Sequence, residues 1–479
     1  MKQFELFDSF IKNNKSDDLV VRDFVALKKR AKLVFIESLT NKQLIDSCVL
    51  APLQKSTNTT KDPTKIISEV ISECGATNKS TVTDIMQELA SGSCIIFFEN
   101  FDSAICVPVP GYEKRAISEP PTSAVVKGPR EGFTEDLQTN LSMIRRRLKT
   151  PSFVVKKMSI GTQTNTQIAI VYLSSVADNA VVAAVTKKLS SIKIDGIIDS
   201  FYIEEFLQEK KNSIFKQVGS TEKPDVAVAK LLEGRIGIVV DGSPIVITVP
   251  YIFIEDLQSG EDYYSQPARA TFLRIIRVFG ILIGILLPGF YVATQIFHYR
   301  LLPINFLISL LDSVQGLAFP PLIEILFVLF IFDILNEASV RMPKHLGMAL
   351  SIIGALVLGD TAVQAGLVSP PSILVVAISG ITIYTVPDQV GTMSLIRLGL
   401  TIMGGIAGYY GLLLAFVFLF WYMCGLQNFG SPYLAPYAPN ISQDKKDALI
   451  KAPLKNLITR PKSIPNHNKH RLQSSKEKQ

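Results

Sequence analysis

The sequence has few of the residues that build metal sites and disulfide frameworks. Its 479 residues include five cysteines, with no Cys-x-x-Cys pair among them, and only four histidines. None of these residues has the spacing of a zinc site, so we expect no metal and no other cofactor. The wide spacing of Cys48, Cys74, Cys94 and Cys106 is typical of reduced thiols in a cytosolic domain.

Motifs of the common enzyme classes are also missing. The sequence has no nucleophile elbow, no metal-binding motif and no Gly-x-x-x-x-Gly-Lys-Ser/Thr loop for phosphates. We therefore expect a protein that is not an enzyme. Residues 1–23 are charged and contain no apolar core of signal-peptide type, so we do not expect export of the polar N-terminal part.

Charged residues are scarce in one long stretch of the chain. Asp, Glu, Lys and Arg make up 19% of the sequence, but residues 278–424 contain only ten of them. This partition predicts a polar, cytosolic N-terminal part followed by an α-helical domain that crosses a membrane several times.

The basic excess of the chain lies in its last 40 residues. Residues 440–479 hold ten basic and three acidic residues, which leaves 39 of each charge for residues 1–439. This end of the chain has no aromatic residue, so it fits a tail near anionic lipid better than a nucleic-acid surface. The positive-inside rule then places the C-terminus in the cytosol. The N-terminal part, which is not expected to be exported, places the N-terminus there too, and both ends inside require an even number of spans.

The N-terminal part is predicted to be an α/β region of two small subdomains. An αβ segment covers residues 1–60, the first subdomain 61–150 and the second 151–268. A motif of helix, Gly, strand, turn, strand and Pro occurs at residues 89–108 and again at 231–250. Gly92 and Gly234 hold matching places in the two motifs. Either duplication or convergence on a common hairpin explains the match.

The transmembrane domain is predicted over residues 269–425. Apolar runs at 278–297, 321–335, 346–368, 372–386 and 398–424 are candidate spans, while the run at 301–319 is broken by Pro303, Asp312 and Gly316. The broken run favours an interfacial or re-entrant helix. We expect about four full spans, and then a basic cytosolic tail over residues 426–479.

Acidic residues inside or next to these runs are candidates for function, because a charge in a membrane is costly unless it is paired or hydrated. They are Glu324, Asp333, Glu337, Asp360 and Asp388. One interpretation is that Glu324 and Asp333 pair with basic residues at 300, 341 or 344 and hold helices together. The other is that some of the acids face a water-filled cation path.

One apolar run, residues 346–368, has a face that suits an ion path. On a helix, Leu356, Asp360, Val363 and Leu367 fall on one side, with small residues flanking them. Repeated around a symmetry axis, this face would give a carboxylate ring beside apolar rings that can close by dewetting. The alternative is a buried packing helix in which Arg397 or a backbone amide satisfies Asp360.

Residues 128–150 combine capping residues with an apolar stripe. Thr134 is the expected N-cap, and residues 145–147, all Arg, occupy the last turn. From these features alone, the segment is an amphipathic helix that packs on a sheet. Its arginines are expected to pair with acids between the two subdomains or between subunits.

The same stretch resembles the signature of the A subunit of GerA-type spore germinant receptors. The resemblance rests on Lys127-Gly-Pro-Arg-Glu-Gly-Phe-Thr-Glu-Asp136, Asn140-Leu141 and Ile144-Arg-Arg-Arg147, with further blocks at 222–225, 233–235, 240–244, 261–264, 341–344, 354–369 and 429–433. Lys223 stands where the family often has Arg, and the first 90 residues match no block. The signature or assembly residues that the resemblance implies are Arg130, Glu131, Phe133, Asp136, Asn140, Arg145 and Arg146.

The resemblance implies a subunit of a nutrient receptor in the inner membrane of a spore, multi-pass, with both termini in the spore core. Its expected partners are a transporter-like B subunit, a lipoprotein C subunit, membrane lipid and further copies of itself, but no nucleic acid. The copies would form a pentamer that encloses a nutrient-gated ion channel. A secondary transporter or an accessory membrane scaffold is the alternative function.

Overall fold

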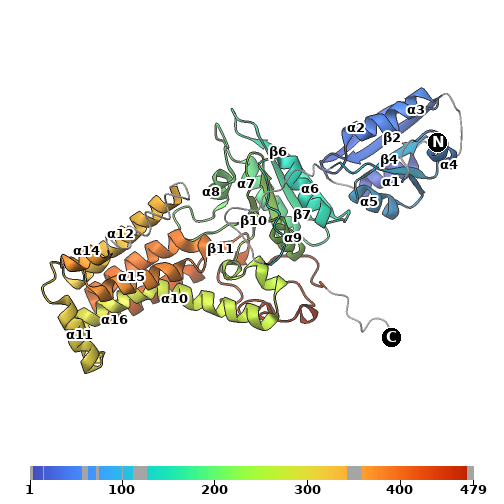
Figure 1. Cartoon of the computed structure of the whole chain (residues 1–479). Coiled ribbons are helices and arrows are strands. Elements are labelled where there is room, and N and C mark those ends of the chain that lie inside the picture. Colours follow the sequence, from blue (N-terminus) through green and yellow to red (C-terminus); the bar gives the residue numbers. More distant parts are fainter. Residues whose placement is uncertain are drawn as a thin grey trace.

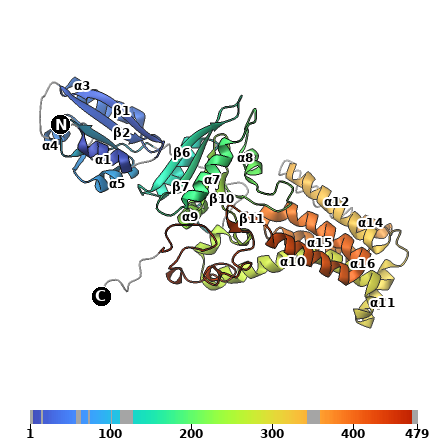
Figure 2. The same cartoon turned by 180° about the vertical axis from the view of Figure 1, so that it is seen from behind.

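The computed structural model describes residues 4–13, 16–56, 63–71, 75–99, 101–111, 127–341 and 359–471. Two sheet-containing units follow one another and lead into a bundle of helices at the other end of the molecule (Figures 1 and 2). The predicted order of an α/β N-terminal region and a helical C-terminal part is confirmed.

The first unit is built on an antiparallel sheet with strand order β1-β2-β4-β5-β3. Its strands are β1 (Leu19–Ala26), β2 (Lys29–Ile36), β3 (Thr77–Lys79), β4 (Ser93–Phe98) and β5 (Ala104–Pro108). Its helices are α1 (Glu5–Asn13), α2 (Lys42–Leu44), η1 (Ile45–Leu50), α3 (Ala51–Lys55), α4 (Pro63–Glu69) and α5 (Val82–Ala90). Successive strand residues point to opposite faces, so β2 packs on η1, α3 and α4 through one face and on α1 and α5 through the other.

The second unit has a sheet with strand order β6-β7-β9-β10-β8. Its strands are β6 (Phe153–Ile160), β7 (Thr166–Leu173), β8 (Gly219–Thr221), β9 (Ile236–Val240) and β10 (Val246–Val249). Helices α7 (Asn179–Ser190) and α8 (Ser200–Leu207) cover one face, and α6 (Leu137–Arg147) and α9 (Pro224–Glu233) cover the other.

The two units have the same topology. Each runs helix, strand, strand, helices, short edge strand, helix, strand, strand, and the short strand pairs with the last one in both sheets. Gly92 and Gly234 both have positive φ, 95° and 104°, in the turn that ends the preceding helix. A shared succession of eight or more elements favours duplication over convergence on a hairpin.

This repeat places the unit boundaries differently from the sequence analysis. The division expected at residue 60 falls inside a single sheet, because β2 on one side of it pairs with β4 on the other. The division expected at residue 150 separates α6 from the sheet that buries its apolar side. The second unit therefore begins with α6, just as the first begins with α1.

Two 3-10 turns, η2 (Phe253–Leu257) and η3 (Gly260–Tyr264), lead into the helical part. It consists of α10 (Pro267–Phe297), η4 (Tyr299–Leu301), α11 (Ile304–Val314), α12 (Pro321–Arg341), α14 (Gly359–Gln364), α15 (Pro370–Ile383), η6 (Pro387–Gln389) and α16 (Val390–Cys424). In the described parts of the chain, two helical stretches have the length and apolar composition of a membrane span, Pro267–Phe297 and Pro387–Cys424, and the second is interrupted at Ala407 and Gly408. The expectation of about four spans stays a prediction.

Helix α16 turns back on itself in the middle. Ala407 and Gly408 have non-helical backbone angles, with φ of 60° at Gly408, and a Cβ on Gly411 would lie 2.6 Å from the carbonyl oxygen of Met403. The run at 398–424, expected to be one span, therefore belongs to two shorter halves. Glycine is required at the reversal because only it adopts this conformation without strain.

The C-terminal segment is folded rather than a free tail. Residues 426–471 contain β11 (Gln427–Asn428), β12 (Ser431–Pro432), η7 (Asp444–Lys446) and η8 (Leu454–Asn456). The segment lies against the second unit and the start of α10 (dark red in Figure 1). Its buried side chains, Leu434, Ala448 and Ile464 among them, explain why it packs despite its basic charge.

Candidate functional site

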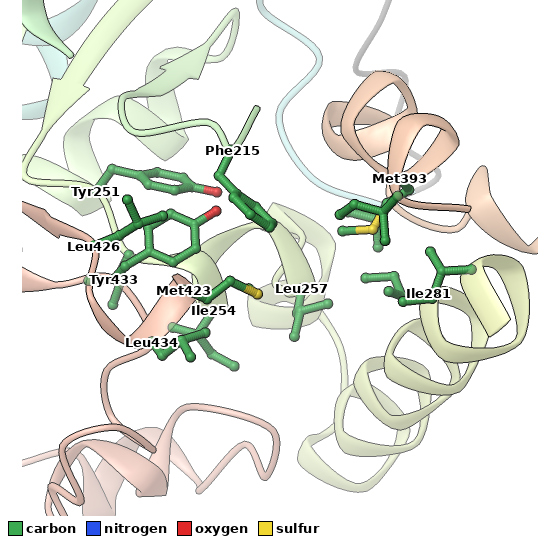
Figure 3. Packing of buried hydrophobic residues seen from close by; sticks show 14 of the residues in the cluster. Phe215, Tyr251, Ile254, Leu257, Ile281, Met393, Met423, Leu426, Tyr433 and Leu434 are labelled. Carbon is green, nitrogen blue, oxygen red and sulfur yellow. The ribbon is translucent and has the colours of Figure 1, made fainter. Parts of the chain in front are cut away.

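The second unit, the bundle helices α10, α15 and α16, and the C-terminal segment meet in one buried apolar cluster, which we call the junction. Figure 3 shows Ile281 of α10 and Met393 of α16 on one side of the junction, and Tyr251 and Tyr433 on the other. The labelled members are Phe215, Tyr251, Ile254, Leu257, Ile281, Met393, Met423, Leu426, Tyr433 and Leu434. Because such cores are close-packed, a shift of the second unit must repack the helix ends that share this cluster.

Arg274, near the start of α10, is fully buried beside the junction. Its Nε donates to a carboxylate oxygen of Asp262 at 3.0 Å, and its Nη1 donates to the Asp447 carboxylate at 3.1 Å and to the carbonyl of Ala448 at 2.7 Å. Arg277, one turn further on, also donates to Asp262, at 2.9 Å. The first turns of α10 are thereby tied to η3 and to the C-terminal segment at once.

The two carboxylates that hold Arg274 differ in their electrostatics. Burial alone would raise the pKa of Asp262, but hydrogen bonds from Arg277 and Arg274 outweigh it and hold the pKa below its ordinary value. At Asp447 burial dominates, and the pKa is raised although Arg274 and Tyr263 bond to it. Asp262 is therefore the firmly ionised partner at neutral pH.

A second polar group lies where η6 leads into α16. Nε2 of Gln389 donates to the Asp256 carboxylate at 2.6 Å, and the Tyr251 hydroxyl donates to the same carboxylate oxygen at 2.6 Å. Nζ of Lys216 lies 3.9 Å from the carboxylate of Asp388, whose side chain is 61% exposed. These contacts bind the start of α16 to the second unit.

Burial shifts the ionisable groups at this second site. It raises the pKa of Asp256, against the opposing effect of Lys216, and it also raises the pKa of Glu204. Burial would lower the pKa of Lys216, but the charges of Asp256, Asp388 and Glu204 outweigh it and raise that pKa. Lys216 therefore supplies the positive charge that balances Asp256, Asp388 and Glu204 near the start of α16.

The described residues contain no group of three or more His, Cys, Asp or Glu side chains that could hold a metal ion. A cavity of about 70 Å³ lies between the second unit and the C-terminal segment, lined in part by Glu233, Arg235 and Arg471. These charges pair with one another, since Glu233 lies 3.3 Å from Arg235 and 3.7 Å from Arg471. These ion pairs join the second unit to the C-terminal segment.

The signature residues lie at the start of the second unit. Asp136, and not Thr134 as expected, is the N-cap of α6, where it accepts a hydrogen bond from a first-turn amide at 2.6 Å. Asn140 is fully buried, accepts from the Thr134 amide at 2.8 Å and donates to its carbonyl at 2.5 Å. Phe133 is buried, and Arg130 is exposed in the loop before the helix. Asn140 therefore fixes this loop on α6.

The three arginines at the end of α6 bind different partners. Arg145 is 4% exposed and donates to both carboxylate oxygens of Asp18, at 2.8 and 2.6 Å. Asp18 belongs to the first unit, so this ion pair joins the two units of the structure. The sequence analysis expected a partner in the other subdomain or another subunit, whereas Asp18 lies in the segment 1–60 that it kept separate. Arg146 and Arg147 lie 3.5 and 2.5 Å from Glu131 and hold the signature loop.

The acids of the apolar region do not gather in one place. Asp333 pairs with the buried Arg397 of α16 at 2.8 Å, rather than with a basic residue at 300, 341 or 344. Glu337 pairs with Arg341 on its own helix, and both side chains are exposed. Glu324 is buried and accepts hydrogen bonds from the N-cap residue of α15. Each acid thus has its own environment.

The predicted pore face is described only in part. Leu356 lies outside the described residues. Asp360 and Val363 lie on α14, but Leu367 follows the end of this helix, where Gly366 has φ of 68°. Asp360 is exposed and accepts from the last residue of α14 at 2.9 Å, not from Arg397. The helical face therefore does not continue to Leu367.

Sequence reasoning missed the buried arginines. The sequence analysis gave no role to Arg274, and it placed two of its partners, Asp447 and Ala448, in a basic cytosolic tail. The signal that could have found the contact is the pair of carboxylates at 444 and 447 in an otherwise basic segment. An acidic residue in a basic segment is a candidate for a specific ion pair. For Asp447 the partner is Arg274.

Comparisons with known proteins agree with the resemblance seen in the signature. The model of a family described as Bacillus/Clostridium GerA spore germination protein matches residues 6–463. The chain is 37% identical to spore germination protein KA of Bacillus subtilis (strain 168), over 95% of this chain and 85% of that protein. It is 32% identical to spore germination protein B1 of the same organism, over 95% and 97%. A solved structure, the N-terminal domain of the A subunit of the Bacillus megaterium spore germinant receptor GerK3, is similar at 25% identity and a TM-score of 0.39, covering 52% of this chain and 92% of that one.

Proposed function

The chain belongs to the Bacillus/Clostridium GerA spore germination protein family, and on this premise we propose that it is a membrane subunit of a nutrient receptor that triggers spore germination. Relatives named spore germination proteins align with most of both chains, which supports the receptor assignment. The proposed location is the spore inner membrane, with a multi-pass helical domain and both termini in the spore core. The proposed partners are a transporter-like B subunit and a lipoprotein C subunit.

The observation that carries this proposal is the junction. The middle and C-terminal part of α10, the C-terminal end of α15 and both ends of α16 share one apolar core with η2 and the loop around Phe215. A nutrient signal that moves the second unit would repack these helix ends directly, without a flexible linker between sensor and bundle. That is the coupling a receptor needs between a soluble unit and a membrane domain.

We propose further that copies of the chain form a pentamer and that α14 lines an ion path at its axis. The exposed carboxylate of Asp360 and the partly buried Val363, one turn apart on α14, support this placement. Around an axis, five such carboxylates would attract cations, and five valines would form an apolar constriction.

The test is Val363→Ala in spores that carry the full receptor. A smaller side chain at an apolar gate should raise ion release without nutrient and start germination spontaneously. The control is Val417→Ala, the same substitution at an exposed position of α16. Ion release and germination are measured in the absence of nutrient, and receptor abundance by immunoblot. Normal abundance of the Val363 variant with unchanged ion release would remove α14 from the ion path.

A further inference from the structure

A polar cluster lies inside the helical part, where α10, α12 and α15 meet. Oε1 of Glu324 on α12 accepts from the backbone amide of Ser369 at 2.6 Å and from its hydroxyl at 2.7 Å. The Ser369 hydroxyl lies 2.9 Å from that of Ser372, which lies 3.5 Å from the Tyr291 hydroxyl. Gln295, one turn after Tyr291 on α10, donates to that hydroxyl at 2.7 Å. We call these five residues the Glu324 cluster.

Two buried oxygen atoms of the Glu324 cluster have no hydrogen-bond partner among the described residues. They are Oε2 of Glu324, in a residue that is 1% exposed, and Oε1 of Gln295. The ion pairs that α12 makes within the described ranges belong to Asp333 and Glu337, not to Glu324. Within the described parts of the chain, the carboxylate is therefore buried with one oxygen unsatisfied and forms no ion pair with a basic side chain.

The surroundings make this arrangement costly unless a positive charge completes it. Side chains of Val292, Ile325, Leu329 and Val376 form a buried apolar cluster on the same three helices. The N-terminus of α15 offers partial positive charge to the carboxylate through the bond of the Ser369 amide to Oε1, but among the described residues nothing donates a hydrogen bond to Oε2. A desolvated carboxylate that lacks a counter-charge is strongly disfavoured.

We propose that the Glu324 cluster binds a monovalent metal cation, Na⁺ or K⁺. This site deepens the proposed membrane function and rests on it. The cluster offers a carboxylate, two serine hydroxyls, a phenol and an amide oxygen, which are the hard ligands such cations prefer. One carboxylate balances one positive charge, whereas protein sites for Mg²⁺ or Ca²⁺ use more acidic ligands.

Occupancy of the site has a structural consequence. The ligands come from the last turns of α10, the first turn of α12 and the N-terminus of α15. A bound cation would link these three helix ends, and its loss would leave repulsion between unsatisfied oxygens at the same place. The packing of these three helix ends would therefore depend on the concentration of the cation around the helical part.

The experiment measures cation binding to the full-length protein in detergent. Equilibrium dialysis with ²²Na⁺ and with ⁸⁶Rb⁺ as the tracer for K⁺ is done at constant ionic strength, with choline chloride as the replacement salt. We expect one saturable site per chain for at least one tracer. Glu324→Gln keeps the size and the acceptor oxygen of the side chain but removes the charge, and should weaken binding at least tenfold.

Matched variants separate this site from a general charge effect. Glu337→Gln makes the same change on the same helix at an exposed, ion-paired position and should bind like the unmodified chain. Ser372→Ala removes one hydroxyl ligand without touching the charge and should weaken binding severalfold, which serves as the test if Glu324→Gln does not fold. No saturable binding of either tracer, equal binding by Glu324→Gln, or stabilisation by acid alone with no metal binding would each overturn the proposal. None of these results would bear on the proposed ion path along α14, which the spore experiment tests separately.

Discussion

The contacts of Arg274 lead to a prediction about how firmly the C-terminal segment is held. Arg274→Met keeps most of the apolar length of the side chain but removes its bonds to Asp262, Asp447 and the carbonyl of Ala448. Removing one partner of a buried ion pair costs about 3–5 kcal/mol, because a charge is left buried and unpaired. Asp262 keeps Arg277, so we expect the lower end, about 3 kcal/mol.

The loss should appear as local opening of residues 447–452. The Lys451 amide bonds to the Thr271 hydroxyl at 3.1 Å, and the Ala452 amide bonds to the carbonyl of Lys446 at 2.8 Å, so both report on the attachment. A change of about 3 kcal/mol corresponds to a roughly 100-fold loss of protection against hydrogen exchange at these amides. The measurement is hydrogen exchange by mass spectrometry on the full-length protein in detergent.

The control is Arg269→Met, the same change at an exposed position about one turn earlier in α10. It removes a positive charge of the same helix without touching the buried network, so protection of residues 447–452 should stay as in the unmodified chain. If both variants lose protection equally, net charge and not the buried contacts holds the segment. If neither loses it, Arg274 does not anchor the segment and the reasoning is refuted.

Two further predictions concern the first unit. Arg145→Met leaves the buried Asp18 without its arginine. The amide of Asp17, which bonds to the Val155 carbonyl across the two units, should then exchange its hydrogen roughly 100-fold faster. Arg145→Lys should restore part of the protection. Burial raises the pKa of the Cys94 and Cys106 thiols to about 12. At pH 8 a maleimide should therefore label the exposed Cys424 rapidly, and label Cys94 and Cys106 only after denaturation. Fast labelling of Cys94 in the folded protein would contradict its burial in the sheet.

The sheets could be predicted from the sequence because their signals are local. Alternation of apolar residues, the Gly at each helix end and the Pro after each hairpin identified β4, β5, β9 and β10. The unit boundaries could not be predicted in the same way. Whether α6 packs on the preceding or the following sheet depends on contacts such as Leu141 with Val171, which no short window contains.

The helical part shows how one local pattern can have two outcomes. Glycines four apart suggest close helix packing, and Gly280 and Gly284 do pack against α15, where added Cβ atoms would meet Thr385 and Ile383. Gly404 and Gly408 have the same spacing, but Gly404 packs on Gly289 of α10 while Gly408 reverses the chain. Spacing alone does not separate a packing glycine from a turn glycine, because the difference lies in φ.

The acidic residues of the apolar region also show that one sequence pattern can have two structural outcomes. Glu324 and Asp333 give equal signals in the sequence, since each is a single carboxylate in an apolar run. Asp333 lies opposite Arg397, 64 residues away along the chain, while among the described residues the groups that hydrogen-bond to Glu324 are the amide and the hydroxyl of Ser369. An acid that has an arginine is explained by its ion pair. An acid that has none is the one whose burial calls for a ligand, and for this reason the cation site is assigned to Glu324 rather than to its neighbour nine residues further along α12.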